Sequence, residues 1–480
     1  MNRRMVLYTV GTAVKIEAAL LLLPAACALI YKENSLKAIL ISAAICLAAG
    51  FALTLVSRPG NKVIYAREGF ITVALAWIAL SAFGALPFYI SGEIPSYIDA
   101  FFETVSGFTT TGSSILTDIE AMSKGLLFWR SFTHWIGGMG VLVFIMAVIP
   151  SLSDRNMHLL RAEVPGPIVG KLVPRIRHTA RILYIIYVVM TVIEIILLII
   201  GRMPVFEAVV HAFGTAGTGG FGVKSDSIAG YSPYLQWVIT VFMLLFGINF
   251  NLYYLLLIRR FKSVFKSSEL WVYFGIVASS TAAITANIAA SYESFSTAFR
   301  ASAFQVVSII TTTGYATTDF DRWPVFSKMI LLTLMFVGAC AGSTGGGFKI
   351  ARIIILAKTV KRELKKLLHP RSVSALKFEG KALSESTVSS VSSYLSIYVF
   401  LFFAVLVLLC FESFDLETNI SAVAACFNNI GPGFGAVGPT LSFAEYSPFA
   451  KLLLSLAMLL GRLEIYPLFI ALSPSTWTKK

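Results

Sequence analysis

Charged residues are scarce in this chain of 480 residues: aspartate, glutamate, lysine and arginine make up 13%, whereas hydrophobic residues make up 57%. Soluble globular domains carry about 25% charged residues. The mean hydropathy is +0.79, and apolar stretches recur that reach the roughly 20 residues a helix needs to cross a bilayer. The shortage of charge therefore excludes a set of soluble domains and predicts an all-α polytopic membrane protein.

Residues that bind metals or form disulfides are also few. The five cysteines stand in apolar surroundings without CxxC spacing, and the five histidines show no ligand spacing, so neither a disulfide framework nor a zinc site is indicated. Glu194, His134 and His211 are expected within the membrane but are isolated in sequence. A membrane-embedded enzyme needs a cluster of such groups, and the sequence predicts that the protein is not an enzyme.

Lysine and arginine nevertheless outnumber acidic residues, and the formal net charge is +14. They cluster in alternate gaps between the apolar stretches, a bias typical of cytoplasmic loops, which puts both termini in the cytoplasm. No polar segment is large enough to fold into a domain that binds nucleic acid, so none is expected as a partner. The clusters lie at residues 3–4, 58–67, 155–177, 259–266, 358–371 and 479–480.

Ten membrane spans are predicted, an even number that agrees with two termini on one side of the membrane. The eighth is interrupted by glycines, and the others are expected to be continuous. The spans are residues 5–30, 37–57, 70–91, 125–149, 179–201, 233–258, 270–290, 325–366 (interrupted), 387–411 and 446–472.

The outer gaps after the first two spans share a feature. Each holds an apolar segment of about 10–14 residues, too short to cross the membrane, which ends in a small, polar, glycine-bearing window. We number these windows 1 to 4: "SGFTTTGSSIL" (106–116), "GTAGTGGFGVK" (214–224), "SIITTTGYATT" (308–318) and "CFNNIGPGFGA" (426–436). Aligned on Gly112, Gly220, Gly314 and Gly431, they lie 108, 94 and 117 residues apart, which indicates an internal repeat.

This repeat predicts two extra N-terminal helices followed by four pseudo-fourfold units of span, pore helix, loop and span. The leading helices are expected in residues 1–60. The four units are residues 61–150, 151–262, 263–375 (with the interrupted span) and 376–480. Repeats related by inversion, as in many secondary carriers, are an alternative. Repeats of one orientation fit a ring better.

Four such windows in one chain predict an ion pathway. Irregular backbone at membrane depth is tolerated only where it is buried in protein or lines a watery cavity, and four related copies most simply surround a common axis. Glycine lets the backbones approach closely. A ring of carbonyl oxygens can then replace the hydration shell of a large monovalent cation. One window alone would be read as a helix end and a turn, but four in register favour a selectivity filter.

The four windows and the two leading helices resemble the Trk/Ktr/HKT superfamily of potassium transporters over essentially the whole chain, and most closely its bacterial TrkH branch. In that superfamily the glycine of each window is the selectivity position, and serine in the first marks many sodium-permeable plant members. Glycine at all four positions here favours potassium, although windows 2 and 4 depart from TTTG. The resemblance implies potassium-binding filter residues Thr110, Thr111, Gly112, Thr218, Gly219, Gly220, Thr312, Thr313, Gly314, Asn429, Ile430 and Gly431.

The resemblance also implies a function, a substrate and partners for the protein. It implies potassium uptake across the bacterial cytoplasmic membrane, with potassium as substrate and no organic cofactor in this chain. A sodium-preferring relative and a proton- or sodium-coupled symporter are the alternatives. The implied partners are membrane lipid, a second copy of the chain in a homodimer, and a cytosolic nucleotide-binding regulatory subunit of the RCK type. The basic segments 151–178 and 358–371 are surfaces on which such a regulator could dock.

The interruption of the eighth span predicts a gate. Glycine costs about 1 kcal/mol relative to alanine in a helix interior, so "GACAGSTGGGFKIAR" (338–352) is expected to leave the helix and lie below the filter; tight packing of small residues is the alternative. The resemblance implies a gating loop at Gly342, Ser343, Thr344, Gly345, Gly346 and Gly347.

Arg462 is expected well inside the last span, where the resemblance implies contact with the gating loop. The alternative is an arginine that snorkels to the cytoplasmic face or is structurally paired. Glu464 is expected to be a poor partner for Arg462, and Lys349 and Arg352 are expected at the inner mouth.

Overall fold

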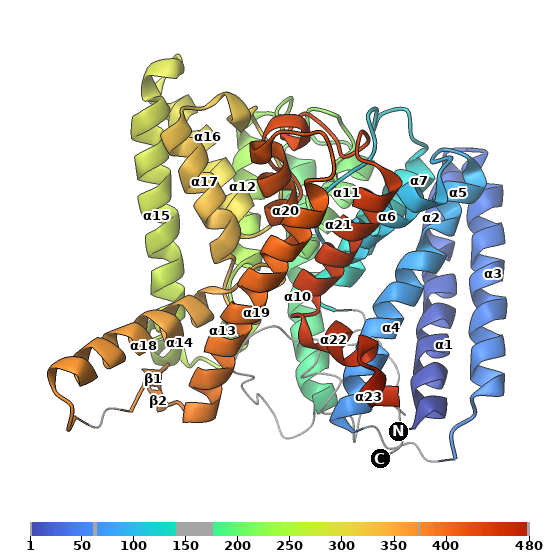
Figure 1. The fold of residues 1–480 in the computed structure, drawn as a ribbon. Helices are drawn as coiled ribbons and strands as arrows, with labels where there is room; N and C mark the ends of the chain where they lie inside the picture. Colours follow the sequence, from blue (N-terminus) through green and yellow to red (C-terminus); the bar gives the residue numbers. More distant parts are fainter. Residues whose placement is uncertain (1, 61–64, 141–175, 373–374, 478–480) are drawn as a thin grey trace.

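The computed structural model describes residues 2–60, 65–140, 176–372 and 375–477. The predicted fold class is confirmed, because almost all regular structure in this part of the chain is helical and many helices are apolar. The two strands, β1 (Lys377–Phe378) and β2 (Lys381–Ala382), form one small antiparallel hairpin. Both termini lie at the same end of the bundle (Figure 1).

Six described helices, or runs of two joined helices, are long and apolar enough to cross a membrane: Arg3–Ile30, Ser35–Val56, Arg67–Ser91, Arg181–Ile200, Ser268–Ser291 and Glu385–Leu409. They are formed by all or most of α1 (Arg3–Leu20), α2 (Leu22–Ile30), α3 (Ser35–Val56), α4 (Ala66–Gly84), α5 (Leu86–Ser91), α10 (Ile176–Ile200), α15 (Ser268–Ile288) and α19 (Glu385–Leu409). The fourth predicted span is described only through α7 (Lys124–Gly138) and residue 140. Residues 141–175, which hold the rest of that span and most of the predicted basic segment 151–178, lie outside the described residues.

Two spans that were expected to be continuous are broken, so this expectation is wrong. Helices α12 (Pro233–Phe246) and α13 (Phe250–Leu257) meet at 90°, and α21 (Pro448–Arg462) and α22 (Tyr466–Leu472) meet at 119°. At the first break, Asn249 starts the new helix by accepting a hydrogen bond from the Asn251 amide. At the second, Glu464 and Ile465 both have positive φ angles, which a regular helix cannot contain.

The predicted interruption of the eighth span is present. Helix α17 (Val325–Val337) ends before the glycines, and α18 (Ile350–Leu368) begins after them. We call residues 338–349 the glycine-rich loop. If each of the two bent pairs is one span, the described residues contain eight spans by length and composition.

Four short helices occupy the half of the bundle away from the termini (Figure 1). They are α6 (Tyr97–Phe108), α11 (Val205–Gly217), α16 (Phe295–Ile310) and α20 (Leu416–Phe427). Each precedes one of the four windows, as predicted, although α16 has 16 residues and is longer than expected. The boundaries given above for the four repeats stay a prediction.

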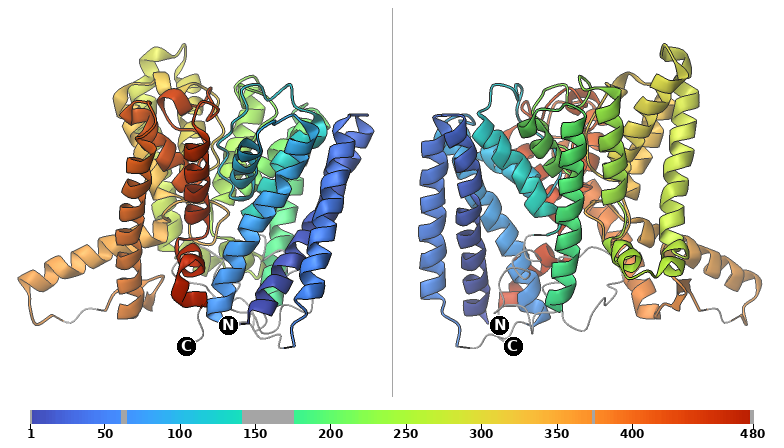
Figure 2. Two further views of the ribbon diagram at one scale, coloured as in Figure 1. Left: turned by 45° about the vertical axis from the view of Figure 1, so that its right-hand side comes forward. Right: turned by 180° about the vertical axis from the view of Figure 1, so that it is seen from behind.

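The two leading helices form a flank of the bundle, with α1 packed against both α3 and α4 (Figure 2). Close approach of α1 and α3 depends on small residues: a methyl group on Gly50 would lie 2.8 Å from the Gly11 carbonyl oxygen. Small residues at crossing points are the usual means of helix association in membranes. Two short α-helices lie at the end that carries the termini: α14 (Phe261–Phe265) and α23 (Pro474–Trp477).

Candidate functional site

Each of the four short helices ends in the same backbone motif. The amides of Thr111, Gly219, Thr313 and Ile430 each donate to the carbonyl five residues earlier, over 2.8–2.9 Å. The preceding amide in each window bonds to the carbonyl three residues earlier. This pair of bonds defines a Schellman motif, which places one residue in the left-handed conformation and satisfies the last carbonyls of the helix.

The left-handed residue of this motif is not glycine in any window. Thr110, Thr218, Thr312 and Asn429 adopt φ angles of 55°, 53°, 59° and 57°. For a β-branched residue such as threonine this is an unusual conformation, and strain of this kind, of order 1–3 kcal/mol per residue, persists mainly at functional sites. The repetition of the same strained backbone four times marks the windows as a candidate site.

The four windows converge into a closed ring. A methyl group on Gly112 would lie 2.1 Å from the Gly219 carbonyl oxygen, one on Gly220 would lie 2.0 Å from that of Thr313, and one on Gly314 would lie 2.0 Å from that of Ile430. Gly431 closes the ring, since its methyl would lie 2.9 Å from the Thr111 oxygen. Each glycine has a positive φ, between 80° and 106°, so both conformation and space require glycine here.

Every other predicted filter residue lies in or directly beside this ring. The side chains of Thr110, Thr111, Thr218, Thr312, Thr313, Asn429 and Ile430 are buried. Most of the side-chain hydroxyls already have protein partners: Thr111 bonds to Thr109 and to the Asn429 amide, and Thr313 bonds to Thr311. Among the described residues, the Thr110 hydroxyl and the Asn429 side-chain oxygen have no partner, so the windows can offer a cation these two side-chain oxygens besides their main-chain oxygens.

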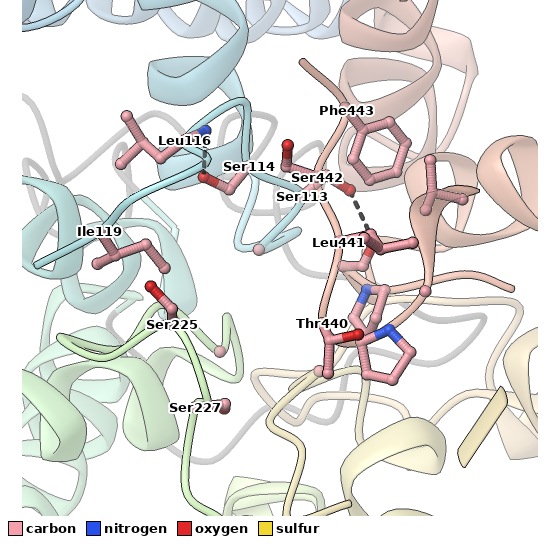
Figure 3. Close-up of a pocket in the computed structure, with 18 of the residues that line it drawn as sticks. Ser113, Ser114, Leu116, Ile119, Ser225, Ser227, Thr440, Leu441, Ser442 and Phe443 are labelled. Atoms are coloured by element: carbon pink, nitrogen blue, oxygen red, sulfur yellow. Dashed lines mark hydrogen bonds between the residues drawn. The ribbon is translucent and has the colours of Figure 1, made fainter. Parts of the chain in front are cut away.

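The ring opens into a cavity of about 300 Å³ (Figure 3). All four ring glycines line it, together with Ser113, Ser114, Ser225, Ser227, Thr440 and Ser442, which Figure 3 labels. Its lining is mostly uncharged, with Lys224, Arg130 and Glu445 as the ionisable side chains. Lys224 lies 4.4 Å from the ring centroid of Tyr231, and the Tyr231 hydroxyl donates to Glu207. Burial, with this hydrogen bond, raises the pKa of Tyr231.

A buried ion pair supports windows 1 and 2 from behind. Arg130 on α7 and Glu103 on α6 are 2.6 Å apart, with side chains that are 2% and 0% exposed. The Glu103 carboxylate also accepts from the Ser114 hydroxyl and the Ile115 amide, and Arg130 donates to the Gly222 carbonyl over 3.1 Å. The pair thus ties the segment that follows Gly112 to the segment that follows Gly220.

The glycine-rich loop packs against the side of the ring that faces the chain termini. The Gly346 amide donates to the Thr312 hydroxyl over 2.6 Å. A methyl group on Gly345 would lie 2.9 Å from the Thr311 oxygen, and one on Gly346 would lie 2.6 Å from the Asn428 oxygen. The loop therefore touches windows 3 and 4 directly.

Arg462 contacts this loop, but its position differs from the prediction. It is the last residue of α21, at the bend, and does not lie well inside a continuous span. Its guanidinium donates to the Thr344 oxygen over 2.9 Å and to the Gly137 and Gly138 oxygens over 2.6 and 2.9 Å. Arg462 thus bridges the glycine-rich loop to the end of α7.

Lys349 and Arg352 are both buried, and their place at the inner mouth stays a prediction. Lys349 is 1% exposed and donates to the Gly345 oxygen within the loop. Arg352 is 5% exposed and pairs with Glu464 over 2.6 Å. Glu464 is therefore the acidic partner of Arg352.

Sequence reasoning missed Glu103, Arg130 and Glu269. Glu269, near the start of α15, accepts from the Ala341 amide over 2.6 Å and so holds the glycine-rich loop from the side. The available signal was a charged residue inside an apolar segment, which in membrane proteins marks a buried and paired group. The partners could not be found in this way, because Glu103 and Arg130 are 27 residues apart in sequence.

Comparisons with known proteins agree with this architecture. The chain matches the TrkH family, described as "Cation transport protein", over residues 35–274 and 259–479. The Trk system potassium uptake protein TrkH of Salmonella typhimurium is 37% identical over 99% of this chain and 100% of its own length. The Trk system potassium uptake protein TrkG of Escherichia coli is 36% identical over 99% of this chain and 98% of its own.

A solved structure gives the same result. The crystal structure of the potassium transporter TrkH from Vibrio parahaemolyticus aligns with a TM-score of 0.88 and 34% identity, and the alignment covers 100% of both chains. The helical membrane fold, its central ring of windows and these matches define the class: a membrane cation-transport protein rather than an enzyme. Within that class, the chain belongs to the TrkH family.

Proposed function

We propose that this chain carries potassium into the bacterial cytoplasm through a single central pathway, with the ring of four windows as its selectivity filter. One observation supports this proposal above all: four helix ends of the same backbone motif bring each of the glycines 112, 220, 314 and 431 against a carbonyl oxygen of a neighbouring window. The names of the relatives, which are potassium uptake proteins and a potassium transporter, agree with potassium as the substrate.

The windows act on the ion through their main chain. Potassium enters from the outer cavity, and carbonyl oxygens replace its hydration water. The four short helices direct their C-terminal ends, with their partial negative charge, toward the ring. Because most threonine hydroxyls have protein partners, the carbonyls of Thr111, Gly219, Thr313 and Ile430 are the main ligands in this proposal.

The glycine-rich loop is the gate in this proposal. It blocks the pathway below windows 3 and 4, and Arg462 holds it there through Thr344. A cytosolic nucleotide-binding subunit of the RCK type would release it, and a homodimer in the cytoplasmic membrane, with both termini inside the cell, is the proposed assembly. Relatives named as parts of a "Trk system" support the presence of further components.

The proposed function is tested by growth and by flux. A bacterium that lacks potassium uptake and expresses this chain is expected to grow on low potassium. Purified protein in vesicles is expected to take up rubidium, a potassium substitute, faster than sodium. Sodium uptake that equals or exceeds rubidium uptake in folded protein would contradict the assignment of potassium.

Replacement of Arg462 is expected to open the pathway. Arg462 joins the loop to α7 by donating to three carbonyl oxygens, and Arg462→Gln removes this charged donor. If this loss costs the closed state ~2 kcal/mol, the ratio of open to closed protein rises about thirtyfold. Rubidium uptake into vesicles without any added regulator measures this change.

The matched control is Arg202→Gln. Arg202 follows the end of α10, on the side away from the termini, and is exposed. Its replacement removes the same charge without touching the loop, so basal rubidium uptake is expected to stay unchanged. Equal basal rubidium uptake in the Arg462 variant and the original protein would show that Arg462 does not hold the gate closed.

A further inference from the structure

Window 2 differs from the other three windows at the residue that precedes its ring glycine. Windows 1, 3 and 4 place Thr111, Thr313 and Ile430 at this position, and all three branched side chains are buried. Window 2 has Gly219 there. Because the backbone motif is the same in all four windows, window 2 is the one that lacks a side chain of its own at this point.

The imidazole of His134 takes up the missing space. His134 lies on α7 and is 0% exposed. A methyl group on Gly219 would lie 1.3 Å from the Nδ1 atom of His134 and 2.2 and 2.3 Å from two further atoms of the same imidazole. These are the three closest atoms that such a methyl group would meet. The imidazole therefore occupies the volume into which a side chain at position 219 would extend.

This occupied space, and not the backbone conformation, requires glycine at position 219. Gly220 has a φ of 80°, whereas the φ of Gly219 is not positive. In windows 1 and 3, threonine holds the corresponding position, also without a positive φ. A residue with a side chain can adopt such a backbone, so the glycine at 219 and the histidine at 134 depend on each other.

His134 also contacts the segments on both sides of Gly219. A methyl group on Gly217 would lie 2.3 Å from the His134 carbonyl oxygen, and the imidazole centroid lies 4.1 Å from that of the Phe221 ring. Neither imidazole nitrogen has a hydrogen-bond partner among the described residues, so the imidazole acts on window 2 by packing. The Gly219 carbonyl oxygen on which it bears is the one that faces Gly112 of window 1.

We propose that His134 is a specificity-determining positioning residue of the filter. Its imidazole stands in for the branched side chain of the other windows and holds the Gly219 carbonyl oxygen in place from behind, without binding the ion itself. Ion selectivity depends on the size of the site and on the number and field of its oxygens, so support of this one oxygen affects the choice of ion. The inference rests on the proposed function, because it concerns the same filter.

The first test is thermal unfolding of the whole protein, which needs no transport. Gly219→Ala is expected to lower the unfolding temperature, because its methyl group overlaps the imidazole. In a His134→Ala background the same change is expected to cost little, since the imidazole is gone. Equal losses in the two backgrounds would show that His134 does not fill the space beside Gly219 and would overturn the inference.

The second test is selectivity in vesicles. His134→Ala is expected to lower the ratio of rubidium to sodium uptake about tenfold, which corresponds to ~1.4 kcal/mol, because the Gly219 oxygen loses its support. His134→Gln keeps a polar side chain of similar size and is expected to retain most of this ratio. The double variant Gly219→Thr with His134→Ala gives window 2 a branched side chain, as in windows 1 and 3, and is expected to raise the ratio above that of His134→Ala.

The matched control is Ile39→Ala, a buried side chain on α3 in the flank formed by the leading helices. It also leaves a cavity, so the unfolding temperature is expected to fall while the uptake ratio stays unchanged. A ratio that falls equally in Ile39→Ala and His134→Ala would assign the effect to general loss of stability and overturn the inference.

The outcomes separate this inference from the proposed function. An unchanged ratio in His134→Ala, in a protein that prefers rubidium, overturns the inference and leaves the proposed function intact. An original protein without preference for rubidium contradicts the proposed function, and the unfolding measurements then still decide whether His134 supports window 2.

Discussion

Gly314→Ala is expected to abolish potassium transport while the protein still inserts and folds. The new methyl group would lie 2.0 Å from the Ile430 oxygen and 2.9 Å from a side-chain atom of Pro432. Main-chain atoms of a neighbouring window cannot move aside as a flexible side chain does. Alanine at a φ of 82° adds about 1–2 kcal/mol of backbone strain. Windows 3 and 4 must therefore separate, and the ring loses the oxygen positions that would dehydrate the ion.

The measurement is rubidium uptake into vesicles, with membrane insertion and thermal unfolding followed in parallel. The matched control is Gly275→Ala, on α15, where a methyl group meets no atom within 4 Å and alanine is the better helix former. This control is expected to transport normally. Rubidium uptake at the original rate in Gly314→Ala would show that window 3 is not part of the pathway.

Arg130→Ala is expected to cause the largest loss of stability. The change leaves the Glu103 carboxylate buried without its cationic partner, and breaking a buried ion pair in this way costs about 3–5 kcal/mol. It also removes the donor to the Gly222 oxygen and the guanidinium that stacks 3.5 Å from the Phe221 ring. Because both contacts hold window 2, rubidium selectivity over sodium is expected to fall together with the unfolding temperature.

Two variants test whether the unpaired Glu103 carboxylate causes the loss of stability. Arg322→Ala removes an arginine whose side chain is 86% exposed and which pairs with Asp319; exposed pairs contribute about 0–1 kcal/mol, so little change is expected. The double variant Glu103→Gln with Arg130→Met removes both charges and is expected to recover much of the lost stability, because no unpaired charge remains. Equal instability in the single and double variants would assign the defect to packing.

The sequence predicts the ring because its requirements are local. Each window needs a helix end, a left-handed residue and a glycine within a few positions, and these leave a readable pattern such as TTTG. Besides these local requirements, the ring needs only one further condition: the four related windows must meet in space. For this reason Gly112, Gly220, Gly314 and Gly431 lie together in the structure as expected, and the role of these residues as ion ligands stays a prediction.

The bends and the ion pairs could not be predicted because they depend on contacts between distant segments. The turn at Glu464 and Ile465 carries no glycine, and its positive φ angles lie beside the contact of Glu464 with Arg352, 112 residues away in sequence. The pairing of Glu103 with Arg130 likewise joins two helices whose order along the chain does not fix their contacts. A single sequence shows that a buried charge needs a partner but does not show which one.

The hydroxyl groups beneath the ring show what a ring made by one polypeptide permits. Thr110 and Thr312 hold the same backbone angle, yet the Thr110 hydroxyl has no hydrogen-bond partner in the described part of the chain, whereas that of Thr312 is bound to Gly346. A homotetramer would have to repeat any such contact in every quadrant. Because all four windows belong to one chain, the residue at position 312 can change without a change at position 110, so the contact with the glycine-rich loop and the structure of the opposite window can evolve separately.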